Sequence, residues 1–210
     1  MADLNDLYQG VIDGNAKKAR SLSQEAMAEG TAPGKVLTEA LIPAMAEVGR
    51  RMKEGEYYVP EVLISARAMY AALGVLRPML AETGAKPAGV VVAGTVKGDL
   101  HDIGKNLVCM MLEGTGYEVH DLGTDVPPGR FVEAIQQNQA NIVALSALLT
   151  TTMPSMKSTI DAIKEAGLRD RVKILIGGAP VTQRYASEIG ADGYAPDAAS
   201  AVDKAHEVAV

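Results

Sequence analysis

The spacing of apolar residues changes once along this chain of 210 residues, near residue 84. Before that point, apolar residues recur at helical spacing in a sequence rich in Ala, Leu, Met and Glu. Beyond it, short apolar runs typical of strands alternate with helical stretches. The turn-forming sequence TGAKP at 83–87 separates the two patterns, as a linker does. We therefore expect two domains, residues 1–84 and residues 88–210.

The first domain is predicted to be a four-helix bundle around one apolar interior. Glycine and proline residues separate the helical stretches. Pro60 is compatible with the last helix because proline is tolerated in the first turn. The helices are expected over residues 3–12, 15–29, 33–53 and 59–82.

The second domain is predicted to be a flavodoxin-like, doubly wound sheet of five parallel strands flanked by helices. Ligands of such sheets bind at the carboxyl ends of the strands, so function is expected in the loops that follow the strands. The strands are expected at 89–96, 117–122, 141–146, 172–177 and 192–195. The helices are expected at 102–114, 128–138, 153–167, 181–189 and 197–208.

Composition narrows the classes of function. The single Cys109 excludes an intramolecular disulfide and a cysteine-based zinc site, so a cytoplasmic location is the default. A net charge of -6, no Trp and one Phe leave neither a basic stripe nor a stacking platform for nucleic acid. The N-terminus is polar, and we expect no stretch both long and apolar enough to span a bilayer, hence no membrane partner.

A histidine flanked by carboxylates follows the first predicted strand, in the sequence GDLHDIGKN at 98–106. Neutral imidazole is a good ligand of transition metals, and a carboxylate on its other ring nitrogen fixes the tautomer. Asp99 is the candidate partner of His101. The structural alternative is a helix-cap or surface histidine. The loop lacks both nucleotide-binding glycine patterns, and the only other histidines, His120 and His206, do not favour a polynuclear phosphohydrolase centre.

Small and hydroxyl-bearing residues follow the third and fourth predicted strands, as SALLTTT at 146–152 and GGAP at 177–180. Such residues allow a long ligand to enter between sheet and helix, with hydrogen bonds along its length. Taken separately, Ser/Thr clusters are usually helix caps and Gly-Gly is usually a turn.

Together these motifs resemble a known family. D-x-H-x-x-G from Asp99, S-x-L from Ser146 and the pair Gly177-Gly178 resemble the cobalamin-binding domains of methionine synthase and methylmalonyl mutase. GEYYVPEV at 55–62 and SARAM at 65–69 resemble the helical cap of methionine synthase. The chain is similar throughout to the stand-alone corrinoid proteins of methanogens and acetogens, which serve methanol, methylamine, betaine or methoxyaromatic methyltransferases.

The resemblance implies roles for individual residues. His101 would be the axial ligand of cobalt, Asp99 would hydrogen-bond His101, and Thr152 would end the proton relay, where the family often has serine. The residues implied to contact cobalamin or a related cobamide are Gly98, Asp99, His101, Asp102, Ile103, Gly104, Ser146, Leu148, Thr150, Gly177 and Gly178.

Two residues of the first domain correspond to the apolar cap that shields the methyl group in the family. These are Met52 and Val59, where the family more usually has larger side chains, particularly Phe at the former. Ordinary bundle core is the alternative interpretation of both.

The implied function is that of a methyl carrier. A substrate-specific methyltransferase would transfer a methyl group onto cobalt(I), and an acceptor methyltransferase acting on tetrahydrofolate or a thiol would remove it, with the cap swinging on a hinge near Gly84. A corrinoid-reactivating protein is a further implied partner. The carrier itself is a corrinoid subunit whose status as an enzyme stays open.

Three alternatives remain. A cobalamin-dependent sensor would carry an additional signalling or DNA-binding domain, and the small subunit of a radical mutase would lack the helical half. A flavodoxin-like domain without corrinoid would bind Mg²⁺ or a flavin. The methyl donor, the methyl acceptor, the lower base of the corrinoid and the oligomeric state are left open.

Overall fold

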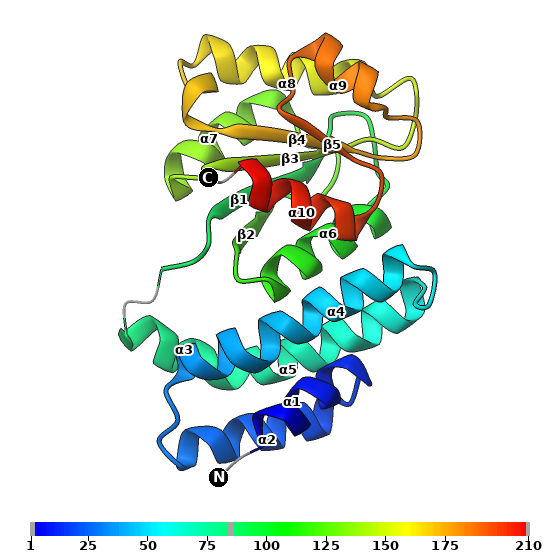
Figure 1. Ribbon diagram of the computed structural model, residues 1–210. Coiled ribbons are helices and arrows are strands. Elements are labelled where there is room, and N and C mark those ends of the chain that lie inside the picture. The colour runs from blue at the N-terminus through cyan, green and yellow to red at the C-terminus, as the bar shows by residue number, and fades with distance from the viewer. Residues whose placement is uncertain (1–2, 84–85, 209–210) are drawn as a thin grey trace. The chain divides into compact units, whose positions relative to one another are not determined.

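The computed structural model describes residues 3–83 and 86–208 and divides the chain into two compact units (Figure 1). The first comprises Met1–Lys86 with Gly114–Gly116, and the second comprises Pro87–Glu113 and Tyr117–Val210. Gly84 and Ala85 lie outside the described residues, so the expected hinge near Gly84 stays a prediction.

The first unit is helical, as its apolar spacing predicted. Asp3 begins its first helix by accepting the backbone N–H groups of Asn5 and Asp6, and Asn15 begins the second by accepting that of Lys18. The elements are α1 (Leu4–Ile12), α2 (Ala16–Ala28), α3 (Pro33–Val36), η1 (Leu37–Leu41), α4 (Ile42–Lys53) and α5 (Val59–Thr83).

The helix expected over 33–53 is interrupted by the π turn η1. In this turn the N–H of Ile42 bonds to the carbonyl of Leu37, five residues earlier. Pro43 has no N–H, so it cannot donate to the carbonyl of Glu39 as an α-helix requires. The proline accounts for the local change of hydrogen-bond pattern, and the four-helix order is kept.

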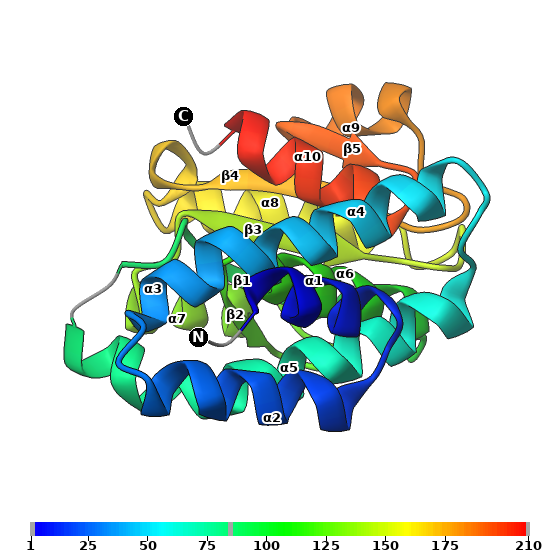
Figure 2. The same cartoon turned by 60° about the horizontal axis from the view of Figure 1, so that its bottom comes forward.

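The expectation that no segment could span a membrane is wrong for α5. Its segment Val59–Leu80 is 22 residues long and has a mean hydropathy of 1.4. By length and composition alone, this segment is long and apolar enough to cross a membrane. A core helix of a globular domain passes the same test, and α2 packs alongside α5 (Figure 2). The side chains of α5 that are buried at heptad spacing are Val62, Ala66, Met69, Leu73 and Leu76. Because 44% of this segment is buried, we interpret α5 as a helix that contributes one face to the bundle core.

The second unit contains the predicted five-stranded parallel sheet. Its strand order is β2-β1-β3-β4-β5, the flavodoxin-like order, so the expected fold class is confirmed. The register places Thr95, Ser146 and Gly177 in one row at the carboxyl ends of their strands. The strands are β1 (Val90–Thr95), β2 (Glu118–Asp121), β3 (Ile142–Ser146), β4 (Lys173–Gly177) and β5 (Gly193–Ala195).

Helices cover both faces of this sheet. Figure 1 shows α6 and α10 on one face and α7, α8 and α9 on the other. Phe131, Met156 and Ile160 are buried against the sheet residues Val92 and Val143 in one apolar core. The helices are α6 (Ile103–Gly114), α7 (Pro128–Asn138), α8 (Pro154–Glu165), α9 (Gln183–Ile189) and α10 (Ala198–Val208), with a short 3-10 turn, η2 (Arg169–Arg171), before β4.

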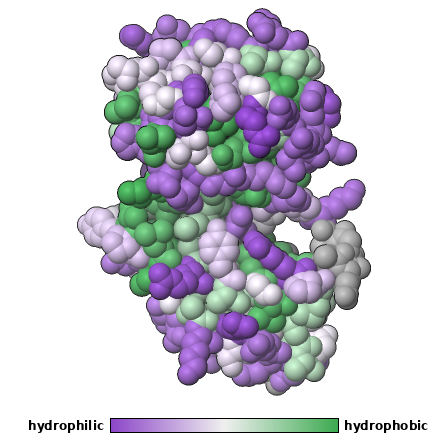
Figure 3. All heavy atoms as spheres, turned by 180° about the vertical axis from the view of Figure 1, so that it is seen from behind, coloured by the Kyte–Doolittle hydropathy of each residue, from purple (hydrophilic) through white to green (hydrophobic). Residues whose placement is uncertain are grey.

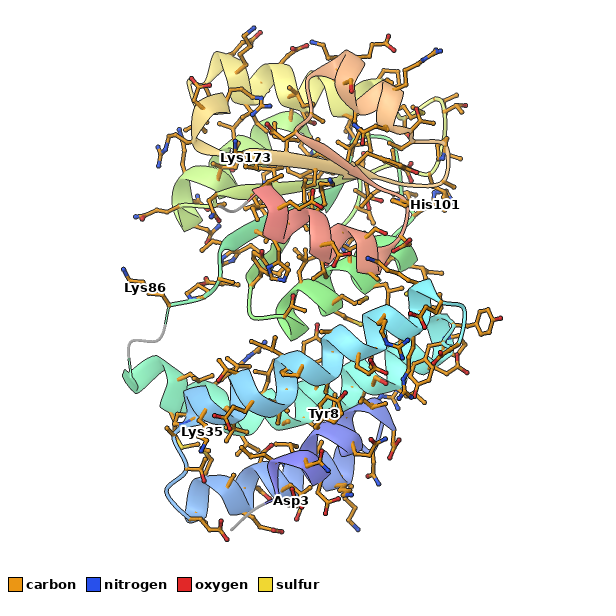
Figure 4. All side chains as sticks on the ribbon, viewed as in Figure 1. Asp3, Tyr8, Lys35, Lys86, His101 and Lys173 are labelled. Atoms are coloured by element: carbon orange, nitrogen blue, oxygen red, sulfur yellow. The ribbon has the colours of Figure 1, made fainter. Side chains whose placement is uncertain are left out.

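The strand order reverses between β1 and β3, which is where sheets of this kind bind ligands. The loop after β1 carries His101. Figure 4 shows His101 at the opposite end of the sheet from Lys173, the first residue of β4, so the histidine lies at the carboxyl ends of the strands.

Candidate functional site

The loop between β1 and α6 holds a buried carboxylate beside a half-exposed imidazole. The Asp99 side chain is completely buried, whereas 51% of the His101 side chain is exposed. The Nδ1 atom of His101 lies 2.8 Å from Oδ1 of Asp99, and the same oxygen accepts the backbone N–H of His101 at 3.1 Å. Asp99 thereby fixes both the backbone and the ring of His101.

The second carboxylate oxygen of Asp99 ties this loop to the loop after β3. Its Oδ2 atom accepts the hydroxyl of Thr152 at 2.7 Å and the backbone N–H groups of Leu148 at 2.8 Å and Leu149 at 3.3 Å. The structure thus brings Thr152 to the pair formed by Asp99 and His101, although Thr152 lies 53 residues after Asp99 in the sequence.

Hydrogen bonding decides the charge of Asp99. Burial alone would raise the pKa of its carboxyl group, but the bonds from Thr152, the Leu148 N–H and His101 hold that pKa well below its usual range. An ionised carboxylate only accepts hydrogen bonds, so in the neutral imidazole Nδ1 carries the proton. Nε2 then presents its lone pair, the arrangement that a metal-binding histidine requires.

Two residues that the sequence analysis did not select also hold this loop. The buried Thr95, the last residue of β1, donates its hydroxyl to the carbonyl of His101 at 2.8 Å. Asp125, in the loop after β2, accepts the N–H of Gly98 at 2.8 Å. The available signals were a hydroxyl residue at a strand end and the sequence Gly-Thr-Asp after the second predicted strand.

The glycines selected from the sequence lie at strand and helix ends, with different surroundings. Gly178 has a φ of +130°, and a Cβ there would lie 1.8 Å from the carbonyl oxygen of Ala147. A Cβ on Gly177 would lie 3.1 Å from the carbonyl oxygen of Ala195. Packing between strand ends therefore accounts for Gly178 without a ligand. Gly104 differs, because its Cβ would meet nothing within 4 Å.

The remaining selected residues of the second unit surround this loop. Apolar side chains reach the molecular surface (Figure 3). Ile103 is 74% exposed, and so is its neighbour Leu100, which the sequence analysis did not select. Leu148 and Thr150 are exposed in the loop after β3, and Ser146 is half-buried at the end of that strand. Exposed apolar residues beside an imidazole suit a large, flat, partly apolar ligand.

Asp102 lies just before α6, and its side chain contacts that helix rather than the imidazole. Its Oδ2 atom accepts the side-chain N–H of Asn106 at 3.1 Å, and its carbonyl accepts the Asn106 backbone N–H at 2.7 Å. The contacts described for Asp102 are therefore those of a residue that begins a helix.

Met52 and Val59 belong to the first unit. Met52 is half-buried near the end of α4, and Val59 is 37% exposed at the start of α5. The intervening loop is held by Tyr57, whose ring lies 5.2 Å from the Arg51 guanidinium and whose hydroxyl donates to the carbonyl of Ile12. Residues of an ordinary bundle core would be fully buried, and neither Met52 nor Val59 is.

The single imidazole of His101 suits a metal whose other ligands are supplied by a cofactor. Among residues 3–83 and 86–208, no group of three or more His, Cys, Asp or Glu side chains could hold an ion. A polynuclear phosphohydrolase centre therefore has no support there. One imidazole with a fixed tautomer can complete the coordination of a metal already held by a macrocycle, and a corrinoid is such a group.

Comparisons with known proteins agree with this geometry. Two models, each described as a B12 binding domain, match residues 89–203 and residues 3–77. A dimethylamine corrinoid protein of Methanosarcina barkeri is 43% identical over 208 residues, covering 98% of this chain and 96% of the relative.

Two solved structures extend the likeness to the whole chain. A cobalamin-binding protein from Desulfitobacterium hafniense is 33% identical with a TM-score of 0.82, and each chain is covered completely. The methanol:cobalamin methyltransferase complex of Methanosarcina barkeri contains a chain 32% identical with a TM-score of 0.86, covering 98% of this chain and 79% of that one.

Proposed function

This chain belongs to the corrinoid proteins that combine a helical and an α/β B12 binding domain, and from that premise we propose that it carries methyl groups derived from dimethylamine. It is a cobalamin-binding methyl carrier of a methyltransferase system. The identity of the methyl donor is the step that we add.

One observation carries the role of the site, namely the Asp99 carboxylate bonded to Nδ1 of His101. His101 would hold the cobalt of the corrinoid through Nε2, and Thr152 would support the Asp99 charge. The corrinoid, when bound, supplies the cobalt that accepts and releases the methyl group. The protein contributes the orientation and the basicity of the imidazole.

We propose that further residues of each unit also contact the corrinoid. Exposed Leu100 and Ile103, together with the space beside Gly104, would accommodate the ring in the second unit. Met52 and Val59 would supply apolar contacts from the first unit. Further contacts are proposed for Gly98, Asp102, Ser146, Leu148, Thr150, Gly177 and Gly178.

Similarity to named relatives favours dimethylamine as the donor. The full-length relatives at 42 to 44% identity include several dimethylamine corrinoid proteins of Methanosarcina. The chain of the methanol:cobalamin methyltransferase complex is only 32% identical. We propose that a dimethylamine-specific methyltransferase docks with this carrier, and that an acceptor methyltransferase and a corrinoid-reactivating protein complete the system in the cytoplasm, without nucleic acid or membrane partners.

Reconstitution followed by transfer assays tests this proposal. The purified chain, incubated with hydroxocobalamin and passed through gel filtration, should retain the coloured cofactor. The reduced holoprotein should then be methylated when the genomic neighbour methyltransferase is supplied with dimethylamine, and not with methanol, monomethylamine or trimethylamine. A carrier methylated only from methanol would refute the choice of donor, and a colourless protein would refute the function.

A further inference from the structure

We infer that Asp125 is a positioning residue for the pair formed by Asp99 and His101. This inference rests on the proposed function, because it assigns Asp125 the task of holding the loop that presents His101 to the corrinoid. Asp125 itself lies on a different loop, between β2 and α7, and contacts neither imidazole nitrogen among the interactions described.

A bulge after β2 brings Asp125 to this loop. The N–H of Thr95 bonds to the carbonyl of Gly123 at 2.9 Å, and the N–H of Val126 bonds to the carbonyl of Thr95 at 3.0 Å. Two residues, Thr124 and Asp125, therefore stand opposite a single position of β1. A bulge of this kind redirects a side chain, and here it turns Asp125 toward the loop after β1.

Three consecutive residues of the site loop bond to Asp125. Its Oδ1 atom accepts the N–H of Gly98 at 2.8 Å, and Nζ of Lys97 lies 3.1 Å from its Oδ2 atom. Its own backbone N–H donates to the carbonyl of Asp99 at 2.9 Å. Asp125 thus fixes the peptide groups on both sides of the Gly98-to-Asp99 link.

The conformation of Gly98 makes these bonds important. Gly98 has a φ of +86°, and glycine restrains its own backbone least of all residues. The direction of the Asp99 side chain, and through it the ring of His101, depends on that backbone. Without the carboxylate of Asp125, the N–H of Gly98 loses its described partner. The next N–H along the chain, that of Asp99, still donates to the carbonyl of Val96 at 3.1 Å, so the peptide before Gly98 is the one held less firmly.

Asp125 makes these three bonds with its own backbone in the left-handed region, which residues with a side chain rarely adopt. Its φ is +53°, and among the described residues only Gln139, at +52°, shares this left-handed region without being glycine. Asp tolerates the region better than most residues, but glycine would relieve the strain entirely. A strained residue with three bonds to the site loop is more consistent with a positioning role than with a simple turn.

The test compares D125N, D125G and Q139G in the holoprotein reconstituted with hydroxocobalamin and reduced to cobalt(II). Asn retains an acceptor for Gly98 and tolerates the left-handed region, whereas Gly retains the backbone conformation without the acceptor. Gln139, at the end of α7, has the same backbone conformation and serves as the matched control. The readouts are the nitrogen splitting in the spin-resonance spectrum, its pH dependence, and thermal unfolding of each apoprotein.

In D125G, relief of the left-handed backbone strain should offset the lost hydrogen bond, so the thermal midpoint of the apoprotein should stay close to the wild-type value. The equilibrium constant for cobalt ligation by His101 should fall about tenfold, because ordering the loop for ligation would then cost about the free energy of one charge-assisted hydrogen bond. D125N should restore ligation to near the wild-type value, and Q139G should not affect it. Wild-type ligation and pH dependence in D125G, or failure of D125N to restore them, would overturn the inference. Failure of the wild-type protein to bind corrinoid would instead remove the proposed function.

Discussion

At the scale of single residues, the site depends on one buried negative charge. Asp99 is completely buried, and its loss of water is compensated by five hydrogen bonds. They come from the Thr152 hydroxyl, the His101 ring and the backbone N–H groups of His101, Leu148 and Leu149. A buried carboxylate without such partners would be neutral or strongly destabilising. The same bonds that keep Asp99 ionised also determine which nitrogen of His101 is available.

Two replacements of Thr152 should distinguish the contribution of its hydroxyl group to stability from the contribution of its shape. Thr152→Val removes the donor to Asp99 while nearly conserving volume, and should destabilise the apoprotein by about 1 to 3 kcal/mol. Thr152→Ser keeps the hydroxyl and should cost clearly less. Urea denaturation measures both, and equal losses in the two variants would show that the hydroxyl is not the important group.

The depressed pKa of Asp99 predicts a pH dependence of stability. An unfolded Asp binds its proton near pH 3.9, before the folded one does, so the unfolded chain binds more protons as the pH falls. The stability from ionised Asp99 is therefore complete above that pH and is lost as the pH falls toward the lower, folded pKa.

The difference in unfolding free energy between the wild type and Asp99→Asn should accordingly shrink below about pH 4. Urea denaturation at a series of pH values measures this difference. A difference that stays constant from neutral to acid pH would contradict the assignment of an ionised Asp99.

The family resemblance of the sequence pointed to the three hydrogen-bonded residues of the site, but no pattern pointed to the residues that hold their loop. His101, Asp99 and Thr152 lie in motifs with fixed spacing, which survive in a single sequence. Thr95 and Asp125 act through backbone groups, and their contacts depend on a register and a bulge that no local pattern encodes.

At the scale of elements, two glycines near the site differ in their surroundings: Gly178 follows β4, and Gly104 lies in the first turn of α6. Gly178→Ala should destabilise the protein severely, by roughly 3 kcal/mol or more, because its Cβ would overlap the backbone of Ala147 at a positive φ. Thermal or urea unfolding measures this. A loss below about 1 kcal/mol would contradict the packing described here.

Gly104→Ala should have the opposite effect on stability from Gly178→Ala. Gly104 lies in the first turn of α6 with open space around its Cα, so alanine should stabilise the apoprotein by about 0.5 to 1 kcal/mol. The added methyl group should nevertheless weaken hydroxocobalamin binding if the cofactor lies against this turn. Titration followed by absorption measures the affinity, and unchanged affinity would place the corrinoid away from Gly104.

The positions of helices and strands were predictable because apolar residues recur with clear helical or strand spacing. The π turn and the membrane-like apolar length of α5 were not predicted. The π turn at Leu37–Leu41 depends on the missing N–H of Pro43, which interrupts a hydrogen-bond pattern without changing the apolar spacing. The apolar length of α5 reflects a core helix that packs along α2.

At the scale of the whole molecule, one boundary in the sequence separates two kinds of structure. The change from helical spacing to alternating strands predicted a bundle followed by a doubly wound sheet, and both were found. B12 binding domain models match each part, and the likeness to a solved cobalamin-binding protein covers the complete chain. The methyl donor could not be predicted in this way, because the motifs resemble carriers that serve several different methyl donors.

The spin-resonance spectrum of the cobalt(II) holoprotein, prepared with histidine carrying the heavy nitrogen isotope, tests the central claim most directly. Nitrogen splitting from the protein should change with the isotope, disappear in His101→Ala, and persist in His120→Ala, whose ring bonds to Glu118 at the edge of the sheet. Splitting that is insensitive to the isotope, or unchanged in His101→Ala, would show that His101 does not bind the cobalt.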